Sequence, residues 1–115
     1  MFKLRSPDSF LWPVKGARPQ ENGGVERFSF RARFKWLDLE QVEDFQRRLM
    51  KGEVNDRTGM AELLIGWDGV GNADGTAPLE FNTATMEEAL SSHHVLQALW
   101  AAWKESQSVG KEKNS

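Results

Sequence analysis

The sequence predicts an α+β fold in which an N-terminal antiparallel β-hairpin or small sheet packs against three to four α-helices. Two changes of pattern carry this prediction. Apolar and polar residues alternate over residues 25–36, as in a strand with one buried face. After residue 38 the apolar residues recur every three or four positions, as in helices. The polar end of the chain, residues 106–115, is expected to be a disordered tail, so residues 1–105 form a single domain.

The first third of the chain predicts the sheet. Residues 10–15 are apolar and contain Pro13, which donates no backbone hydrogen bond, so we expect an edge strand there. Residues 16–24 are rich in glycine and predict a turn, which joins this strand to the next as a β-hairpin. Trp12 is expected in the sheet core. The second strand contributes alternate residues to the same core: Phe28, Phe30, Ala32, Phe34 and Trp36.

A first helix is expected directly after the hairpin. Asp38 and Gln41 have the spacing of a capping box, and Gly52 suits the stop of the helix that they begin. Acidic residues lie in its early turns and basic residues in its last turn, which suits the helix dipole. Its apolar face is expected to consist of Leu39, Val42, Phe45 and Leu49.

A second helix and a loop are expected in the middle of the chain. The helix begins at Asn55 or Asp56 and ends at Gly66. Residues 66–75 contain four glycines and two Asp-Gly pairs, which predict a turn-rich connection, and a short extended piece over residues 78–81 follows it.

The last two helices carry much of the tryptophan. Asn82 or Thr83 is expected to cap the first and Ser92 the second. Five tryptophans are more than a domain of 13.1 kDa readily buries, and tryptophan is enriched at interface hot spots. We therefore predict a partner-binding surface; the alternative, that this face packs on the sheet, stays open. The candidate residues are Trp67, Leu96, Leu99, Trp100 and Trp103.

The composition excludes several classes of protein. The 115 residues include no cysteine, which excludes disulfides, thiolate metal sites and a cysteine nucleophile. The apolar runs are short, and none follows the first basic residues, so we expect no membrane span, no signal peptide and a cytoplasmic location. A net charge of −2 and a pI of about 5.7 argue against a general nucleic-acid-binding protein.

The charges are unevenly distributed along the chain. Residues 1–36 carry a net charge of +5, whereas residues 37–103 carry −8. Two interpretations stay open. The opposite charges stabilise the domain internally, or they favour head-to-tail association between copies, since complementary fields steer encounter.

No residues for catalysis, for cofactor binding or for metal binding are predicted. His93 and His94 are neighbours and point about 100° apart on a helix, so they do not ligate one ion together. The glycine-rich loop lacks the closing Gly-Lys-Ser/Thr of a P-loop, and Asp74 breaks the dinucleotide spacing. Val70 and Phe81 stand where a calcium loop needs acidic ligands.

The strand over residues 27–35 combines aromatic and basic residues, but not in the arrangement of an RNA-binding sheet. Its aromatic residues share one face and its arginines the other, whereas stacking on bases needs aromatics on the exposed face. We therefore expect the phenylalanines in the core and no nucleic acid among the partners.

Segments spread over most of residues 1–106 carry a family resemblance. They are Phe2–Val14, Phe30–Leu37, Leu64–Val70, Asp74–Gly75, Leu79–Asn82 and Val95–Ser106 with the charged tail after it. The most specific piece is the Gly-Trp-Asp-Gly-Val run that ends the third segment. In these segments the chain resembles the small tail assembly chaperones of siphophages and prophages.

The resemblance implies a non-catalytic protein that works in the cytoplasm of a bacterial host cell. Proteins of this family coat the long helical tape measure protein and keep it soluble until tail tube subunits polymerise around it. In many such phages a longer form, made by ribosomal frameshifting, recruits the tube subunits. Gly110-Lys111 fits a slippery G-then-A run, although an ordinary polar tail is the simpler explanation. The implied partners are the tape measure protein, and the tail tube protein through the longer form; self-association is compatible with this role.

Other classes of function stay open. A structural protein of the tail or the head–tail junction predicts rings and presence in finished particles, and a small protein-binding module predicts neither. A small enzyme or ligand-binding domain predicts a concave polar pocket with a perturbed titratable group. The sequence disfavours this last class most, because it offers no convergent set of acidic and basic groups.

Overall fold

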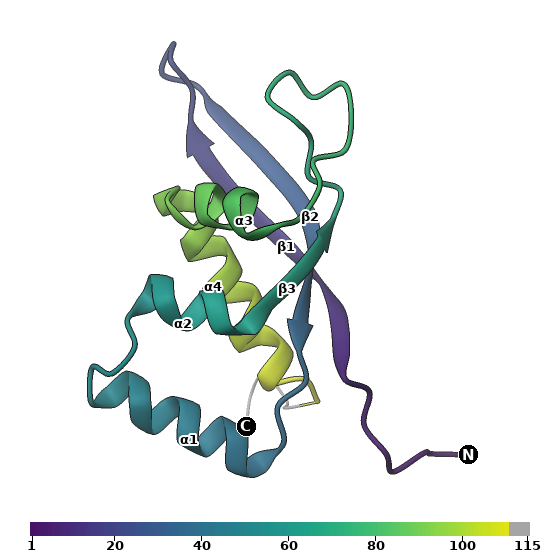
Figure 1. The fold of residues 1–115 in the computed structure, drawn as a ribbon. Coiled ribbons are helices and arrows are strands. Elements are labelled where there is room, and N and C mark those ends of the chain that lie inside the picture. Colours follow the sequence, from purple (N-terminus) through teal and green to yellow (C-terminus); the bar gives the residue numbers. More distant parts are fainter. Residues whose placement is uncertain (111–115) are drawn as a thin grey trace.

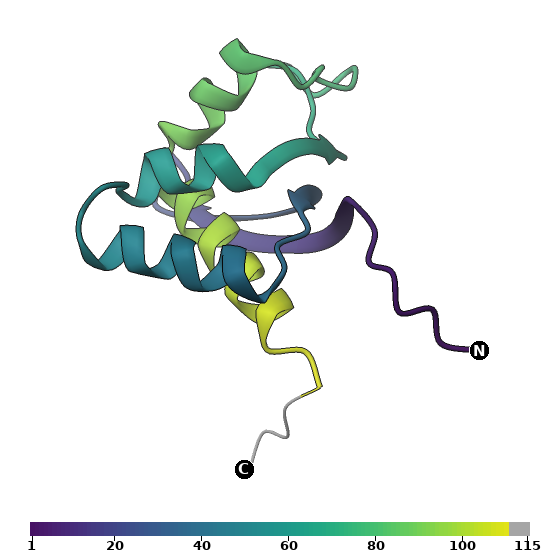
Figure 2. The same ribbon diagram turned by 60° about the horizontal axis from the view of Figure 1, so that its bottom comes forward.

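The computed structural model describes residues 1–110 and has the α+β fold that the sequence predicts (Figure 1). Over these residues, three antiparallel strands form one sheet in the order β1-β2-β3. Four helices accompany the sheet, and Figure 2 shows them gathered to one side of it. The elements are β1 (Ser9–Pro19), β2 (Val25–Lys35), α1 (Leu39–Met50), α2 (Asp56–Leu63), β3 (Leu64–Asp68), α3 (Thr83–Leu90) and α4 (His93–Gln107).

The predicted hairpin is present as β1 and β2, which pair along their whole length. β1 is an edge strand, which is where Pro13 is tolerated because its missing N–H leaves no partner on a neighbouring strand unsatisfied. The register places Phe10 opposite Phe34 and Gly16 opposite Phe28. Alternate apolar residues of both strands therefore point to one shared face.

The third strand corrects the sequence analysis, which predicted a helix up to Gly66 and a loop after it. α2 ends at Leu63, and Leu64 takes extended backbone angles (φ −88°, ψ 117°) and begins β3. The pairing partner of β3 is β2, which is about thirty residues away in the sequence, so local periodicity does not reveal the strand. As a consequence Trp67 lies opposite Ala32 in the sheet.

The covered face of the sheet holds the core. α4 packs against β1 on this face, and Trp12 packs against the core as expected. The indole Nε1 of Trp12 donates a hydrogen bond to Glu105 of α4 at 3.0 Å. The buried cluster combines both strand and helix residues, namely Val14, Ala32, Phe34, Phe45, Met60, Leu63, Leu64, Leu90, Ala98, Leu99, Ala102 and Trp103.

The predicted ends of α1 are confirmed. The Gln41 N–H donates to the Asp38 carboxylate at 3.0 Å, and the Asp38 N–H donates to the Gln41 side chain at 2.9 Å. Gly52 follows the helix with a φ of 75°, and the Glu53 N–H donates to the Arg48 carbonyl at 2.9 Å. This Schellman arrangement satisfies carbonyls that the helix end leaves unpaired.

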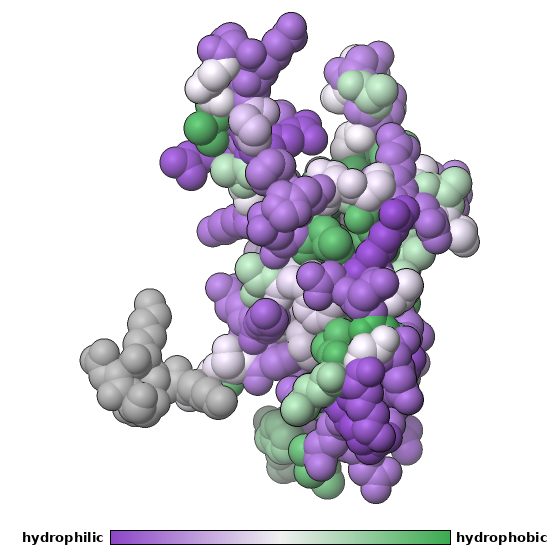
Figure 3. All heavy atoms as spheres, turned by 90° about the vertical axis from the view of Figure 1, so that its left-hand side faces the viewer, coloured by the Kyte–Doolittle hydropathy of each residue, from purple (hydrophilic) through white to green (hydrophobic). Residues whose placement is uncertain are grey.

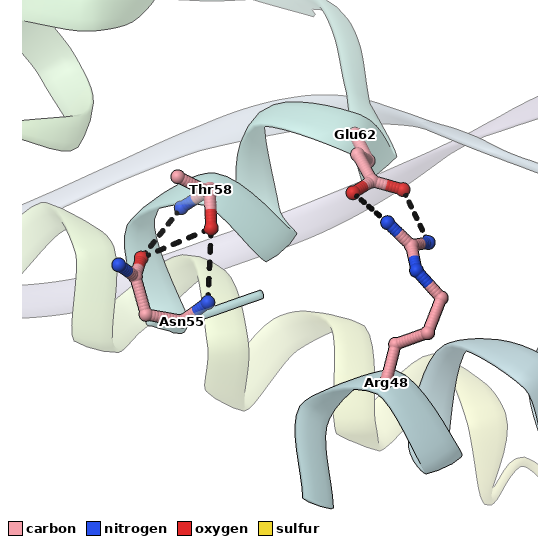
Figure 4. Close-up of polar contacts among 4 residues, drawn as sticks. All are labelled: Arg48, Asn55, Thr58 and Glu62. Atoms are coloured by element: carbon pink, nitrogen blue, oxygen red, sulfur yellow. Dashed lines mark hydrogen bonds and ion pairs between the residues drawn. The ribbon is translucent and has the colours of Figure 1, made fainter. Parts of the chain in front are cut away.

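α2 and α3 begin with capping boxes of a second kind, in which a threonine takes the third position. Asn55 and Thr58 exchange backbone and side-chain hydrogen bonds at 2.9 Å (Figure 4). Asn82 and Thr85 do the same at the start of α3. Ser92 precedes α4 as predicted, but its side chain makes no capping hydrogen bond.

Three expectations about individual residues are wrong. Trp36 is 43% exposed because β2 ends one residue before it and the chain leaves the sheet toward α1. Leu39 is 74% exposed because it occupies the first position of α1, outside the face that packs on the core. Ser106 and Gln107 belong to α4, so the expected tail does not begin at residue 106; residues 111–115 lie outside the described residues.

The close pairing of Gly16 with Phe28 makes a stability prediction. A methyl group on Gly16 would lie 2.3 Å from Cζ of Phe28, so Gly16→Ala forces the ring away from β1. We expect a loss of about 1–2 kcal/mol in the free energy of unfolding, measured by urea denaturation. Gly66→Ala is the matched control, because its Cβ would make an ordinary 3.5 Å contact with Arg33. Equal stability of the two variants would contradict the prediction.

Candidate protein-binding groove

A groove of about 1080 Å³ separates α4 from the connection between α1 and α2. Its apolar part combines side chains from three places: Leu49 at the end of α1, Val54 in the connection, and Leu96, Trp100 and Ala101 on α4. Its polar part carries both signs of charge and comprises Asn55, Asp56, Arg57, His93, Gln97 and Lys104. An apolar floor with a mixed polar rim is the usual composition of a peptide-binding groove.

Trp100 is held in place between the helices. It is half-buried, and its indole Nε1 donates to the backbone carbonyl of Asp56 at 2.9 Å. Its ring stacks on Phe45 of α1 at a centroid distance of 6.1 Å. Gly59 of α2 lets the helices approach, since a Cβ there would be only 3.3 Å from the Trp100 ring. Trp100 therefore forms a rigid wall of the groove and leaves part of its surface accessible.

A bidentate ion pair fixes α1 against α2 near the groove. Arg48 donates to the two carboxylate oxygens of Glu62 at 2.8 and 2.7 Å (Figure 4). The hydrogen bond from Arg48 lowers the pKa of the Glu62 carboxyl from its ordinary value of 4.5, and partial burial opposes this shift. The pair joins the two helices whose ends supply Leu49 and Asp56 to the groove.

The candidate residues from the sequence divide among three places. Leu96 and Trp100 line the groove. Leu99 and Trp103 have exposed fractions of 0% and 4% and belong to the core, so the expectation that they contribute to a partner surface is corrected. Leu99 shares a cavity with Phe28 and Phe30 of the sheet, as the alternative that the sequence left open predicts, whereas the Trp103 ring meets Phe45 of α1 at 5.7 Å.

Trp67 lies at a different place. Its indole Nε1 donates to the Leu79 carbonyl at 2.9 Å, and its ring meets Phe81 edge-on at 4.8 Å. It lines a separate cavity of about 370 Å³ between the sheet, the 69–79 loop and α3. Trp67 therefore anchors the loop after β3 and does not belong to the groove.

Three of the apolar groove residues, Leu49, Val54 and Ala101, were not among the sequence candidates. Leu49 was expected on the buried face of α1, and nothing in a helical period distinguishes a core position from a groove position. Val54 lies between helices, where no periodicity applies, and Ala101 is a small residue without a hydrophobic signal of its own. Only the tertiary arrangement of α1 and α4 brings these residues together.

The face that includes the α1–α2 connection and the start of α4 is mostly hydrophilic, with hydrophobic patches between the charged residues (Figure 3). Within residues 1–110, no three His, Asp or Glu side chains form a group that could hold a metal ion. None of the helices in this part of the chain is long and apolar enough to cross a membrane.

Comparison of the chain with protein families, with curated proteins and with solved structures found no match. The groove therefore has to be interpreted from its own geometry and chemistry.

The Arg48–Glu62 pair predicts a pH dependence of stability. Because the pKa of Glu62 is lowered in the folded state, its contribution is present above pH 4.5 and is lost as the pH falls through the folded pKa. Both side chains are partly exposed, so we expect Glu62→Gln to cost about 0.5 kcal/mol at neutral pH and nothing at pH 2, measured by urea denaturation. In an Arg48→Gln background the same change should cost nothing at either pH. A pH profile of Glu62→Gln identical to the wild type would contradict the assignment.

Proposed function

We propose that this protein is a phage tail assembly chaperone whose groove between α4 and the α1–α2 connection binds an amphipathic helix of the tape measure protein. The observation that carries the proposal is the apolar groove of about 1080 Å³ with Trp100 in its wall. The sequence resemblance supplies the identity of the partner, and the groove supplies a surface that suits a helix.

The dimensions of the groove favour a helical ligand. The α4 residues that line it run from His93 to Lys104, and twelve helical residues span about 17 Å. A ligand helix lying beside α4 would place about three turns in the groove, so apolar side chains spaced by three and four residues would meet Leu96 and Trp100. The charges of the rim, Asp56 and Lys104 among them, can set the direction of the ligand.

The proposed role is non-catalytic and belongs to the cytoplasm of the bacterial host cell. The carboxyl groups with a lowered pKa, Glu26, Glu62 and Asp74, owe it first to a side-chain hydrogen bond, from Arg18, Arg48 and Thr76 respectively. These are structural contacts of exposed or partly exposed groups, which agrees with a binding role. Recruitment of the tail tube protein would fall to a longer, frameshifted form.

Filling the groove should weaken binding without disturbing the core. Ala101 is exposed and lines the groove, so Ala101→Arg places a long side chain where the ligand helix would lie. We expect this variant to bind peptides from the helical regions of the tape measure protein at least about tenfold more weakly, measured by isothermal titration calorimetry.

Ala84→Arg on the exposed side of α3 is the matched control, because it adds the same charge to a helix outside the groove. The proposal is wrong if both variants bind equally well with unchanged circular dichroism. Detection of the protein in finished particles would favour a structural tail component instead.

A further inference from the structure

The outer face of the sheet is uncovered and basic. The side chains that point away from the helices alternate with the core residues along β1 and β2, and most of them are exposed. Lys35, at the end of β2, lines a cavity with α1 and is not part of this face. The other charged residues that β1 and β2 contribute to the outer face are all cations: Lys15, Arg27, Arg31 and Arg33.

These cations are only partly neutralised by their own chain. Arg31 forms an ion pair with Asp68 of β3, and Arg33 donates to the Ser9 hydroxyl at 3.0 Å. In the part of the chain that the structure describes, Lys15 and Arg27 have no carboxylate within salt-bridge distance. Like charges gathered on one face repel each other, so an anionic partner on this face is favourable.

An acidic surface lies on the opposite side of the molecule. Residues 70–92, beyond Asp68, contain four Asp or Glu residues and no Lys or Arg. One of the four, Glu87, pairs with Arg57 of α2 at 3.6 Å. Two of the acids, Glu80 and Glu88, are exposed on either side of Thr85, whose hydroxyl donates to the Glu80 carbonyl at 2.7 Å. α3 lies on the helix side of the sheet, because Thr85 shares a cavity with the covered residue Phe28.

We infer that the outer sheet face of one copy docks on the acidic α3 surface, around Glu80 and Glu88, of a second copy. One chain cannot join these two surfaces, since they lie on opposite sides of its sheet, but two copies can. A docked pair still offers one free basic surface and one free acidic surface, so the contact is heterologous and can propagate into open chains.

A second copy suits this face better than a nucleic acid does. The uncharged residues of the outer face include Leu11, Pro13 and Ala17, and neither β1 nor β2 points an aromatic ring outward on which bases could stack. The net charge of −2 also opposes attraction of a polyanion to the whole molecule.

The size of the face sets the strength of the contact. Two strands of eleven residues give a face about 35 Å long and about 10 Å wide, which is well below the ~800 Å² per partner of a stable complex. The association is therefore weak, depends on protein concentration and is suppressed by salt.

The test is a charge exchange followed by sedimentation velocity. At about 50 mM salt the mass of the wild type should exceed the 13.1 kDa of a single chain as its concentration rises, and at about 500 mM salt it should not.

Two double variants reverse the charge of one surface each: Lys15→Glu/Arg27→Glu on the sheet face, and Glu80→Lys/Glu88→Lys on the α3 surface. Each variant alone should stay at the mass of one chain. An equimolar mixture of the two variants should associate, because it reunites opposite charges. Lys51→Glu/Lys104→Glu, with the same change of charge off the sheet face, should behave as the wild type.

Several results would overturn the inference. The first is that the wild type keeps the mass of one chain at every concentration. The second is that either charge-reversed double variant, when folded, associates by itself. The third is that the equimolar mixture of the two variants does not associate. Binding of single-stranded DNA by the wild type but not by Lys15→Glu/Arg27→Glu, without self-association, would assign the face to nucleic acid. The inference does not rest on the proposed function: Gln97→Arg, at an exposed groove position that shares no cavity with Lys15, should self-associate as the wild type does, whatever its effect on peptide binding.

Discussion

The covering of the sheet from one side only is the constraint on which the rest of this structure depends. Because residues alternate between the faces of a strand, the helix layer sorts the hairpin into two environments. Phe34 and Val14 lie completely buried on the covered face, while Arg27 and Lys15 are exposed and alternate with the core residues. A slip of one residue in the β1–β2 register would exchange the two sets, so burial on a single side also fixes the register.

α4 carries this constraint into the groove. Leu99 and Trp103 occupy the side of the helix that packs into the core, and Leu96 and Trp100 are rotated toward α1 and α2. Trp103 supports the core mainly through its size, since its buried Nε1 has no acceptor among the described residues. Trp100 instead combines a hydrogen bond with partial exposure. Two tryptophans three residues apart thus have different roles because the helix turns about 100° per residue.

The sequence was a good guide wherever a local interaction decides the structure. Alternation identified β2, and short-range side-chain chemistry located the start of α1 at Asp38 and narrowed that of α3 to Asn82 or Thr83, since capping acts within four residues. β3 was missed because its pairing depends on a strand distant in sequence. For the same reason, the apolar face of α4 could be identified but not divided into its core part at Leu99 and its groove part at Leu96.

The positions of the two surfaces matter for how they can act together. The groove opens on the helix side, between α4 and the α1–α2 connection, and the basic face lies on the other side of the sheet. A ligand helix in the groove would therefore leave Lys15 and Arg27 accessible to a neighbouring copy. On a long helical partner, bound copies would be held at high local concentration, so even a contact too weak to persist in dilute solution would form between neighbours. Weak self-association is then an advantage, because it confines assembly to the partner and leaves the unbound protein dispersed.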